Sequence, residues 1–113
     1  MVKKGLEHVV DALVEKGIDT FFLVTWGAIV PTIDYIGQLK NVKYYCFQHE
    51  QAAAMAVEGY YRTSNKIGAV LSTSGPGAQN LLNGICGCWY ESIPAIFITG
   101  QVSTYESSDS IYS

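Results

Sequence analysis

Residues 42–73, VKYYCFQHEQAAAMAVEGYYRTSNKIGAVLST, contain the alternation that decides the fold. Residues 42–48 are apolar and aromatic and predict a β-strand, the Ala-rich residues 50–64 predict a helix, and residues 67–73 predict another strand. A strand, a helix and a strand joined by short loops are typical of parallel strands with a right-handed crossover. This segment therefore predicts an α/β protein.

The same alternation continues on both sides of this segment. Towards the N-terminus, apolar residues at helical spacing over 6–14 end at Lys16-Gly17, residues 19–25 predict a strand, and residues 29–39 predict a second helix after a turn at Gly27. Towards the C-terminus, residues 77–92 predict a helix and residues 94–99 a strand. The expected fold is a three-layer α/β sandwich, a mostly parallel sheet with helices on both faces.

Composition limits the possible functions. The chain has 113 residues, 49% of them hydrophobic and 15% charged, which is enough for one domain with a core. Its net charge is -3 and it has no basic run, so nucleic acid is not an expected partner. Residues 21–33 are the longest apolar-looking stretch and are too short for a bilayer, and no secretory signal is evident, so we expect no membrane partner and a cytoplasmic location.

Three cysteines, Cys46, Cys86 and Cys88, make an odd number. Cys86 and Cys88 are two apart in a predicted helix and would point in different directions. We interpret all three as small core residues in a reducing compartment, and we expect no metal site within the chain.

The loops after the predicted strands are the candidate ligand site, because ligands of open parallel sheets bind beyond the carboxyl ends of the strands. The loop after the third strand, TSGPGAQN at 73–80, is neither a Walker A nor a GxGxxG motif. A purely structural interpretation makes Ser74 a helix cap and places Pro76 in the first turn. It leaves the flanking Gly75 and Gly77 unexplained, since paired glycines suit a close approach to the backbone.

Glu50 stands between a predicted strand and a predicted helix. An acid in the first turn of a helix is stabilised by the helix dipole, by about 0.3–1 kcal/mol, which is one sufficient explanation. The other is that a carboxyl group at a strand end lies in a ligand crevice. We expect the adjacent His49 to be structural, and the run Ala52-Ala53-Ala54 to mark close packing, within the domain or between subunits.

Two segments, taken in order, carry a family resemblance. They are HEQAAAMAVEGYYR at 49–62 and VLSTSGPGAQNLLNGICGCWYESIPAIFITGQV at 70–102. The chain resembles the N-terminal pyrimidine-binding domain of thiamine-diphosphate-dependent enzymes, in the acetolactate synthase-like branch. The resemblance covers about residues 6–102. The domain is therefore expected over 1–102, with residues 103–113 forming a loop that leads into sequence not present here.

The resemblance implies roles for individual residues. Glu50 matches the glutamate that hydrogen-bonds to N1′ of the cofactor's aminopyrimidine and favours its imino tautomer. Gln101 matches a position that faces the reacting centre. The remaining matches are to cofactor-binding positions, namely Thr25, Trp26, Gly27, Thr73, Gly75, Pro76, Gly77 and Asn80.

Two departures from the family pattern stand out. The first glycine-rich turn usually has Gly where this chain has Trp26, which puts the backbone contacts of Trp26 and Gly27 in question. The family also has a middle domain and a C-terminal domain that holds the diphosphate through Mg²⁺, and neither is present here. The fragment alone is therefore expected to be inactive.

The function implied by the resemblance is decarboxylation of a 2-keto acid with carboligation, at an active site formed between subunits of a homodimer or homotetramer. A flavin-containing oxidase with bound FAD shares the same first domain and remains an alternative. From the residues alone, a non-catalytic α/β module also remains open, in which Glu50 only caps a helix and the loop at 73–80 is only a turn.

Overall fold

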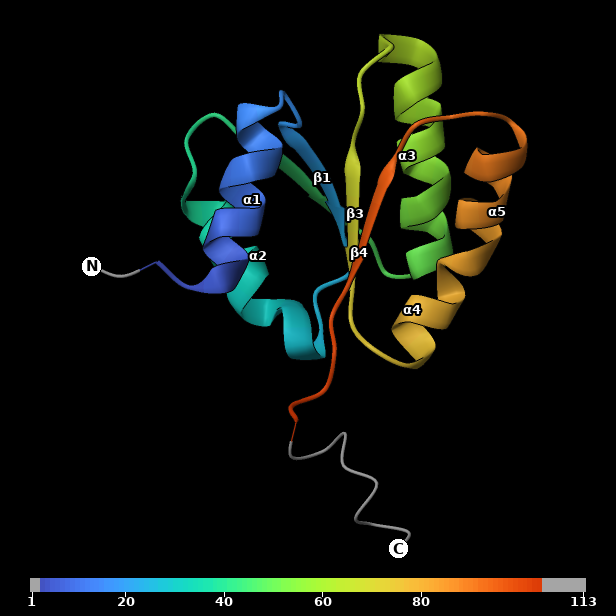
Figure 1. The fold of residues 1–113 in the computed structure, drawn as a ribbon. Helices are drawn as coiled ribbons and strands as arrows, with labels where there is room; N and C mark the ends of the chain where they lie inside the picture. Colours follow the sequence, from blue (N-terminus) through green and yellow to red (C-terminus); the bar gives the residue numbers. More distant parts are fainter. Residues whose placement is uncertain (1–2, 105–113) are drawn as a thin grey trace, which may run out of the picture.

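The computed structural model describes residues 3–104 and has the predicted alternation of strands and helices (Figure 1). The predicted loop at 103–113 lies mostly outside the described residues. The elements, in chain order, are α1 (Gly5–Glu15), β1 (Thr20–Leu23), the 3₁₀ helix η1 (Gly27–Ile29), α2 (Val30–Gln38), β2 (Lys43–Cys46), α3 (Glu50–Ser64), β3 (Ala69–Ser72), α4 (Pro76–Asn80), α5 (Leu82–Tyr90) and β4 (Ile96–Thr99).

The four strands form one parallel sheet in the order β2-β1-β3-β4. From β1 the chain continues to β2 at one edge of the sheet, and from β3 it continues to β4 at the opposite edge. The direction of the connections therefore reverses between β1 and β3. In open α/β sheets this switch point is where a crevice forms at the carboxyl ends of the strands.

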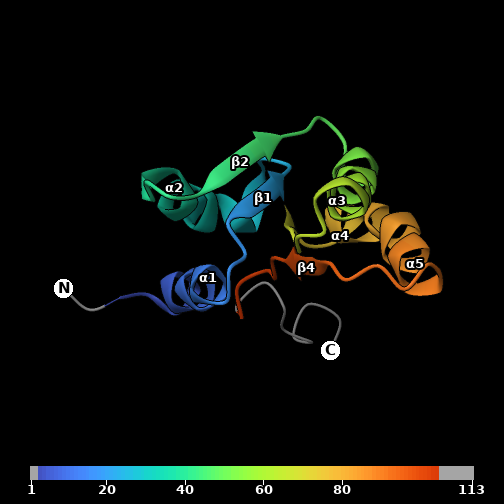
Figure 2. The same cartoon turned by 90° about the horizontal axis from the view of Figure 1, so that it is seen from above.

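Helices cover both faces of the sheet, which confirms the predicted three-layer α/β fold (Figures 1 and 2). Helices α1 and α2 pack on one face, where Phe21 and Leu23 of β1 join Val10 and Ile36 in one buried cluster. Helices α3 and α5 pack on the other face, where Phe22 belongs to a second cluster. Successive residues of β1 thus point to opposite faces, and the central strands β1 and β3 are buried throughout.

The strands are shorter than predicted, and the difference falls at their ends. Val24 and Phe47 continue the apolar pattern of β1 and β2, but they follow the last strand residues and line a pocket. Their backbone amides still donate hydrogen bonds to the neighbouring strands, Val24 to Leu71 O at 3.2 Å and Phe47 to Leu23 O at 2.7 Å. Val24 and Phe47 lie past the regular strands and form walls of the pocket, which explains why the apolar pattern is longer than the strands.

The predicted helix at 77–92 is two helices, α4 and α5, with Leu81 between them. The amide of Leu81 donates to Ala78 O at 3.1 Å, a tighter turn than that of an α-helix, and the Leu81 side chain is fully buried. The apolar periodicity runs across this junction, which is why the sequence suggested one continuous helix. By contrast, α3 has the predicted bounds, and Gly17 follows the end of α1 with a positive φ of 86°.

The prediction that all three cysteines are core residues is wrong for two of them. Cys88 is buried, and burial raises the pKa of its thiol, but Cys46 and Cys86 are exposed. Cys46 ends the edge strand β2, whose residues are all exposed. The apolar pattern of residues 42–48 did not distinguish an edge strand from a buried one.

The alanine run of α3 packs within the domain. Ala53 and Ala54 are fully buried, and a Cβ added to Gly84 of α5 would lie only 2.1 Å from Ala54 Cβ. The two helices therefore approach so closely that only glycine fits at Gly84. Among residues 3–104, no helix is long and apolar enough to cross a membrane.

Candidate functional site

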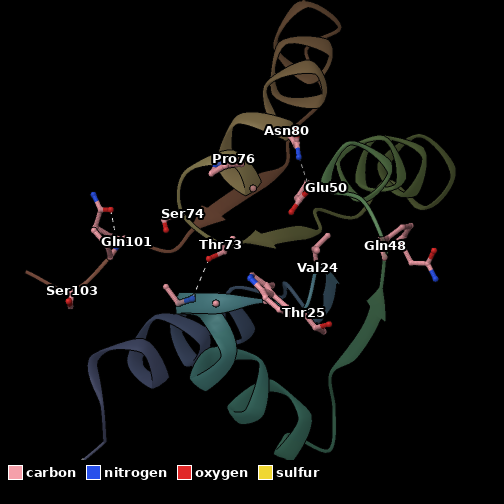
Figure 3. Close-up of a pocket in the computed structure, with 16 residues that line it drawn as sticks. Val24, Thr25, Gln48, Glu50, Thr73, Ser74, Pro76, Asn80, Gln101 and Ser103 are labelled. Carbon is pink, nitrogen blue, oxygen red and sulfur yellow. Dashed lines mark hydrogen bonds between the residues drawn. The ribbon is translucent and has the colours of Figure 1, made fainter. Parts of the chain in front are cut away.

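A cavity of about 1000 Å³ opens at the carboxyl ends of the strands, and residues from all four strand-end loops line it (Figure 3). This is the crevice that the switch point between β1 and β3 predicts. Its lining residues are Val24, Thr25, Trp26, Gly27, Ala28, Phe47, Gln48, Glu50, Thr73, Ser74, Pro76, Gly77, Asn80, Gln101, Val102 and Ser103.

Glu50 is the first residue of α3, and its partly buried carboxylate lines the pocket. Asn80, at the end of α4, donates from Nδ2 to Glu50 Oε2 at 3.0 Å (Figure 3). His49 is the N-cap of α3, and its Nδ1 accepts a hydrogen bond from the Gln51 amide at 3.1 Å, which confirms the structural role predicted for it. His49 thus caps the helix, and the Glu50 side chain points into the pocket (Figure 3).

Gly77 brings the backbone of α4 against the glutamate. A Cβ at this position would lie 3.2 Å from Glu50 Oε1, 2.8 Å from Thr73 Cγ2 and 2.7 Å from Ser72 Oγ. No side chain fits there without displacing these groups. The Glu50 carboxylate therefore lies against the backbone of α4 at Gly77 and is hydrogen-bonded to Asn80 of the same helix.

The loop after β1 is fixed to the loop after β3 through Thr73. Gly27 has a positive φ of 62°, and a Cβ there would lie 2.5 Å from Thr73 Oγ1. That same oxygen accepts a hydrogen bond from the Ala28 amide at 3.3 Å (Figure 3). Trp26 precedes this contact with an extended backbone and an indole that is 75% exposed.

Gln101 lies in the loop after β4, at the exposed side of the pocket. Its side-chain Oε1 accepts a hydrogen bond from the amide of Val102 at 2.9 Å. The start of this loop packs on the β1 side, because a Cβ on Gly100 would lie 3.0 Å from both Ala28 Cβ and Ile29 Cγ2. The loop after β4 thus contributes to the pocket next to the loop after β1.

All the predicted site residues except Gly75 line this one pocket, whereas their roles toward a cofactor stay predictions. Gly75 is the N-cap of α4, with a φ of 61° and open space at its Cβ position, so it shapes the turn and does not form the wall. Pro76 is in the first turn of α4, as expected. The alternative that Ser74 caps this helix is wrong, because Ser74 precedes the cap and lines the pocket.

Sequence reasoning missed Phe47 and Gln48 as lining residues. Both follow β2 directly, and their position after a parallel strand was the available signal. Phe47 also packs near Phe22 of β1, with ring centroids 6.1 Å apart, so it belongs to the core and to the pocket wall. Because Phe47 is apolar, the sequence pattern assigns it to the predicted strand and gives no sign that it also lines the pocket.

Comparison with known proteins assigns the domain. Residues 3–112 match the family model described as thiamine pyrophosphate enzyme, N-terminal TPP binding domain. The chain is 42% identical over 106 residues to the acetolactate synthase large subunit of Cyanidium caldarium, and 46% identical over 101 residues to the acetolactate synthase isozyme 2 large subunit of Escherichia coli (strain K12). These alignments cover 91% and 88% of the chain but 18% of each relative.

The chain therefore spans less than a fifth of the length of these curated relatives. The family match covers nearly all of it, and the four-stranded parallel sheet agrees with that assignment. The chain belongs to the thiamine pyrophosphate enzymes and carries their N-terminal TPP-binding domain, with acetolactate synthase large subunits among its relatives.

Proposed function

We propose that the protein containing this domain is a thiamine-diphosphate-dependent enzyme that decarboxylates a 2-keto acid resembling pyruvate and joins the remaining fragment to an acceptor, as an acetolactate synthase does. The observation that carries the proposal is the Glu50 carboxylate, held by Asn80 and Gly77 inside a pocket at the switch point of the sheet. The names of the relatives support the reaction type.

The pocket suits the aminopyrimidine ring of the cofactor. A flat heteroaromatic ring needs apolar walls and one hydrogen-bonding group at its edge. Val24, Phe47 and Pro76 offer apolar surface, and Glu50 offers the carboxyl group. The absence of a side chain at Gly77 leaves room for a ring to approach the backbone of α4.

In the proposed complex Glu50 would hold the ring nitrogen, with Oε1 as the available acceptor because Oε2 accepts from Asn80. A carboxyl group can hold or release the shared proton there, whereas the amide of a glutamine cannot. Asn80 orients the carboxyl group and Thr73 fixes the loop after β1. Gln101 lines the same pocket, and we assign it to the substrate side. The bound cofactor supplies the electron sink for breaking the carbon–carbon bond of the 2-keto acid.

The remaining parts of the proposal concern the whole protein. We place Mg²⁺ on the cofactor's diphosphate, held by another domain, and an active site between two subunits of a homodimer or homotetramer in the cytoplasm. Bound FAD would indicate the oxidase alternative. The length of the relatives supports the presence of further domains, because each is more than five times as long as the aligned segment.

Thiamine binding to the 113-residue chain tests the pocket directly. Amide spectra recorded during titration with thiamine should shift at Glu50, Gly77 and Asn80, and Glu50→Gln should weaken binding about tenfold because a charge-assisted bond is lost. Glu15→Gln, on the exposed end of α1, is the matched control and should bind like the unchanged chain. Equal binding by both variants would remove Glu50 from the proposal.

Activity is tested in a chimera. Residues 3–102 replace the aligned segment of the E. coli relative, and acetolactate formation from pyruvate is measured with and without Glu50→Gln. We expect the unchanged chimera to be active and the variant to lose at least about 100-fold, the usual range for a group that moves a proton. A folded chimera whose activity is unaffected by Glu50→Gln would favour the non-catalytic module.

A further inference from the structure

Trp26 is a large apolar side chain that the fold does not bury. Its indole is 75% exposed, although it lines the same pocket as Glu50. Exposed tryptophans far from any site are ordinary, but one on the wall of a ligand pocket offers a flat apolar surface to whatever enters. The exposure places Trp26 at the mouth of the pocket, whereas the partly buried Glu50 lies deeper against α4.

The backbone that carries Trp26 is held in place. Its amide donates to Val24 O at 3.1 Å, and the next residue, Gly27, lies against Thr73 with no room for a Cβ. The Ala28 amide bonds to the same threonine. The backbone position of Trp26 is therefore fixed relative to the pocket, so only the rotamer of the indole has to be ordered when a ligand binds.

The pocket is larger than one aminopyrimidine ring needs. Its volume of about 1000 Å³ is at the upper end for small-molecule sites, so a ligand with one ring beside Glu50 has room for a second ring toward the mouth. We infer that Trp26 is a ligand-contacting residue whose indole stacks on the cationic thiazolium ring of thiamine-type ligands, while Glu50 binds their pyrimidine ring. This inference rests on the proposed function.

The chemistry of the two rings explains why Trp26 is assigned to the thiazolium ring and Glu50 to the pyrimidine ring. The thiazolium ring is flat and carries a permanent positive charge on its nitrogen, and tryptophan has the most favourable ring face for a cation. The aminopyrimidine ring has hydrogen-bonding nitrogens, which suit a carboxylate. Trp26 therefore selects for a cationic ring next to the pyrimidine and has no part in holding the pyrimidine itself.

Two ligands separate these contacts. Thiamine has both rings, and 4-amino-5-hydroxymethyl-2-methylpyrimidine has only the pyrimidine. Trp26→Ala should weaken binding of thiamine to the 113-residue chain about tenfold and leave binding of the pyrimidine compound unchanged. Glu50→Gln should weaken both, and Trp26→Phe should restore part of the thiamine affinity lost in Trp26→Ala. Amide spectra give the affinities and show that each variant is folded.

Fluorescence provides a readout that does not depend on activity. The chain has two tryptophans, and Trp89 of α5 is 80% exposed and outside the pocket. In Trp89→Phe, Trp26 is the only tryptophan, so its emission should be quenched by thiamine and much less by the pyrimidine compound at equal saturation. Trp26→Phe, with Trp89 intact, is the matched control and should show little quenching.

The outcomes distinguish this inference from the proposed function. If Glu50→Gln weakens both ligands but Trp26→Ala binds thiamine normally, the role of Trp26 is overturned and the pocket stands. If Trp26→Ala weakens both ligands equally, Trp26 holds the pyrimidine and the division of contacts is wrong. If neither ligand shifts the pocket amides, the assigned contacts of both Glu50 and Trp26 are overturned, and the chimera alone tests the proposed reaction.

Discussion

The two faces of the sheet are packed by different means. On the face of α1 and α2, large side chains such as Ile36 and Leu23 fill the space between helices and strands. On the face of α3 and α5, Ala54 and Gly84 bring the helices almost into backbone contact. The second face also bears Glu50 at the start of α3 and Asn80 at the end of α4.

The difference shows how this fold positions a site. Large side chains can adjust their rotamers, so a face filled by them tolerates small shifts. Two backbones in contact cannot shift without separating, so the start of α3 is fixed relative to α4 and α5. The face that carries the carboxylate therefore contains, besides its larger core residues, one helix–helix contact that allows little movement, between α3 and α5.

Ile36→Ala should have the largest effect on stability and almost none on the pocket. Ile36 is fully buried in the cluster of α1 and α2, so removing its side chain leaves a cavity that costs about 2–5 kcal/mol of unfolding free energy. Urea denaturation measures the loss. Thiamine affinity of the folded protein should change less than about twofold, and a larger change would show that the two faces are coupled.

Gly84→Ala should lower the unfolding free energy by about 1–3 kcal/mol, because the new Cβ meets Ala54 of α3 at 2.1 Å. Gly87→Ala in the same helix is the control. Its Cβ would have its nearest neighbour at 3.6 Å, so it should stabilise the helix by up to about 1 kcal/mol.

A double variant sharpens this test. Ala54→Gly removes the methyl group that the new side chain meets, so it should recover part of the stability lost in Gly84→Ala. Amide shifts at Glu50 should accompany Gly84→Ala and be absent from Gly87→Ala. Equal behaviour of the two glycine variants would contradict the proposed rigidity of the α3–α5 contact.

Gly77→Ala should cost less stability than Gly84→Ala and affect the pocket more. The atoms that its Cβ would meet are the side-chain ends of Ser72, Thr73 and Glu50, which can rotate away. We expect a loss of about 1 kcal/mol in unfolding free energy and a loss of detectable thiamine binding. Titration of the variant with thiamine checks the second point, and unchanged affinity would show that Gly77 has no part in the pocket floor.

Asp11→Asn should have the smallest effect, confined to the first face. Asp11 accepts a hydrogen bond from Lys3 and another from the Tyr35 hydroxyl at 2.7 Å, and these bonds, Lys3 first, lower the pKa of its carboxyl group. A lowered carboxyl pKa stabilises the fold above the ordinary pKa of an aspartate, and this contribution is lost as the pH falls through the folded-state pKa.

Melting temperatures measured from pH 7 to pH 3 test the predicted direction of this pH dependence. The unchanged protein should melt slightly higher than Asp11→Asn at pH 7, and the difference should disappear at the acid end. The effect is small because both Lys3 and Asp11 are solvent-exposed enough for water to screen the pair. A difference that grows toward low pH would contradict the assigned direction.

Local patterns in the sequence were enough to predict the fold class and most of the residues that line the pocket. Hydrophobic runs of strand length alternating with helical periodicity are local patterns, so α3 is predicted with the bounds that it has, and the strand-end loops are predicted as the candidate ligand site, where the structure has a pocket. The family resemblance pointed to Glu50 and Asn80, which prove to be hydrogen-bonded neighbours although 30 residues apart in the chain.

Long-range packing sets the strand order, the exposure of β2 with Cys46, the break at Leu81 and the position of Ser74 in the pocket wall instead of at the helix cap. It also placed Ala54 against Gly84 and left Trp26 exposed at the mouth of the pocket. Each of these depends on which segments meet across the fold. Local propensity cannot specify such contacts, because the same residue suits a strand, a core or a pocket wall depending on what packs against it.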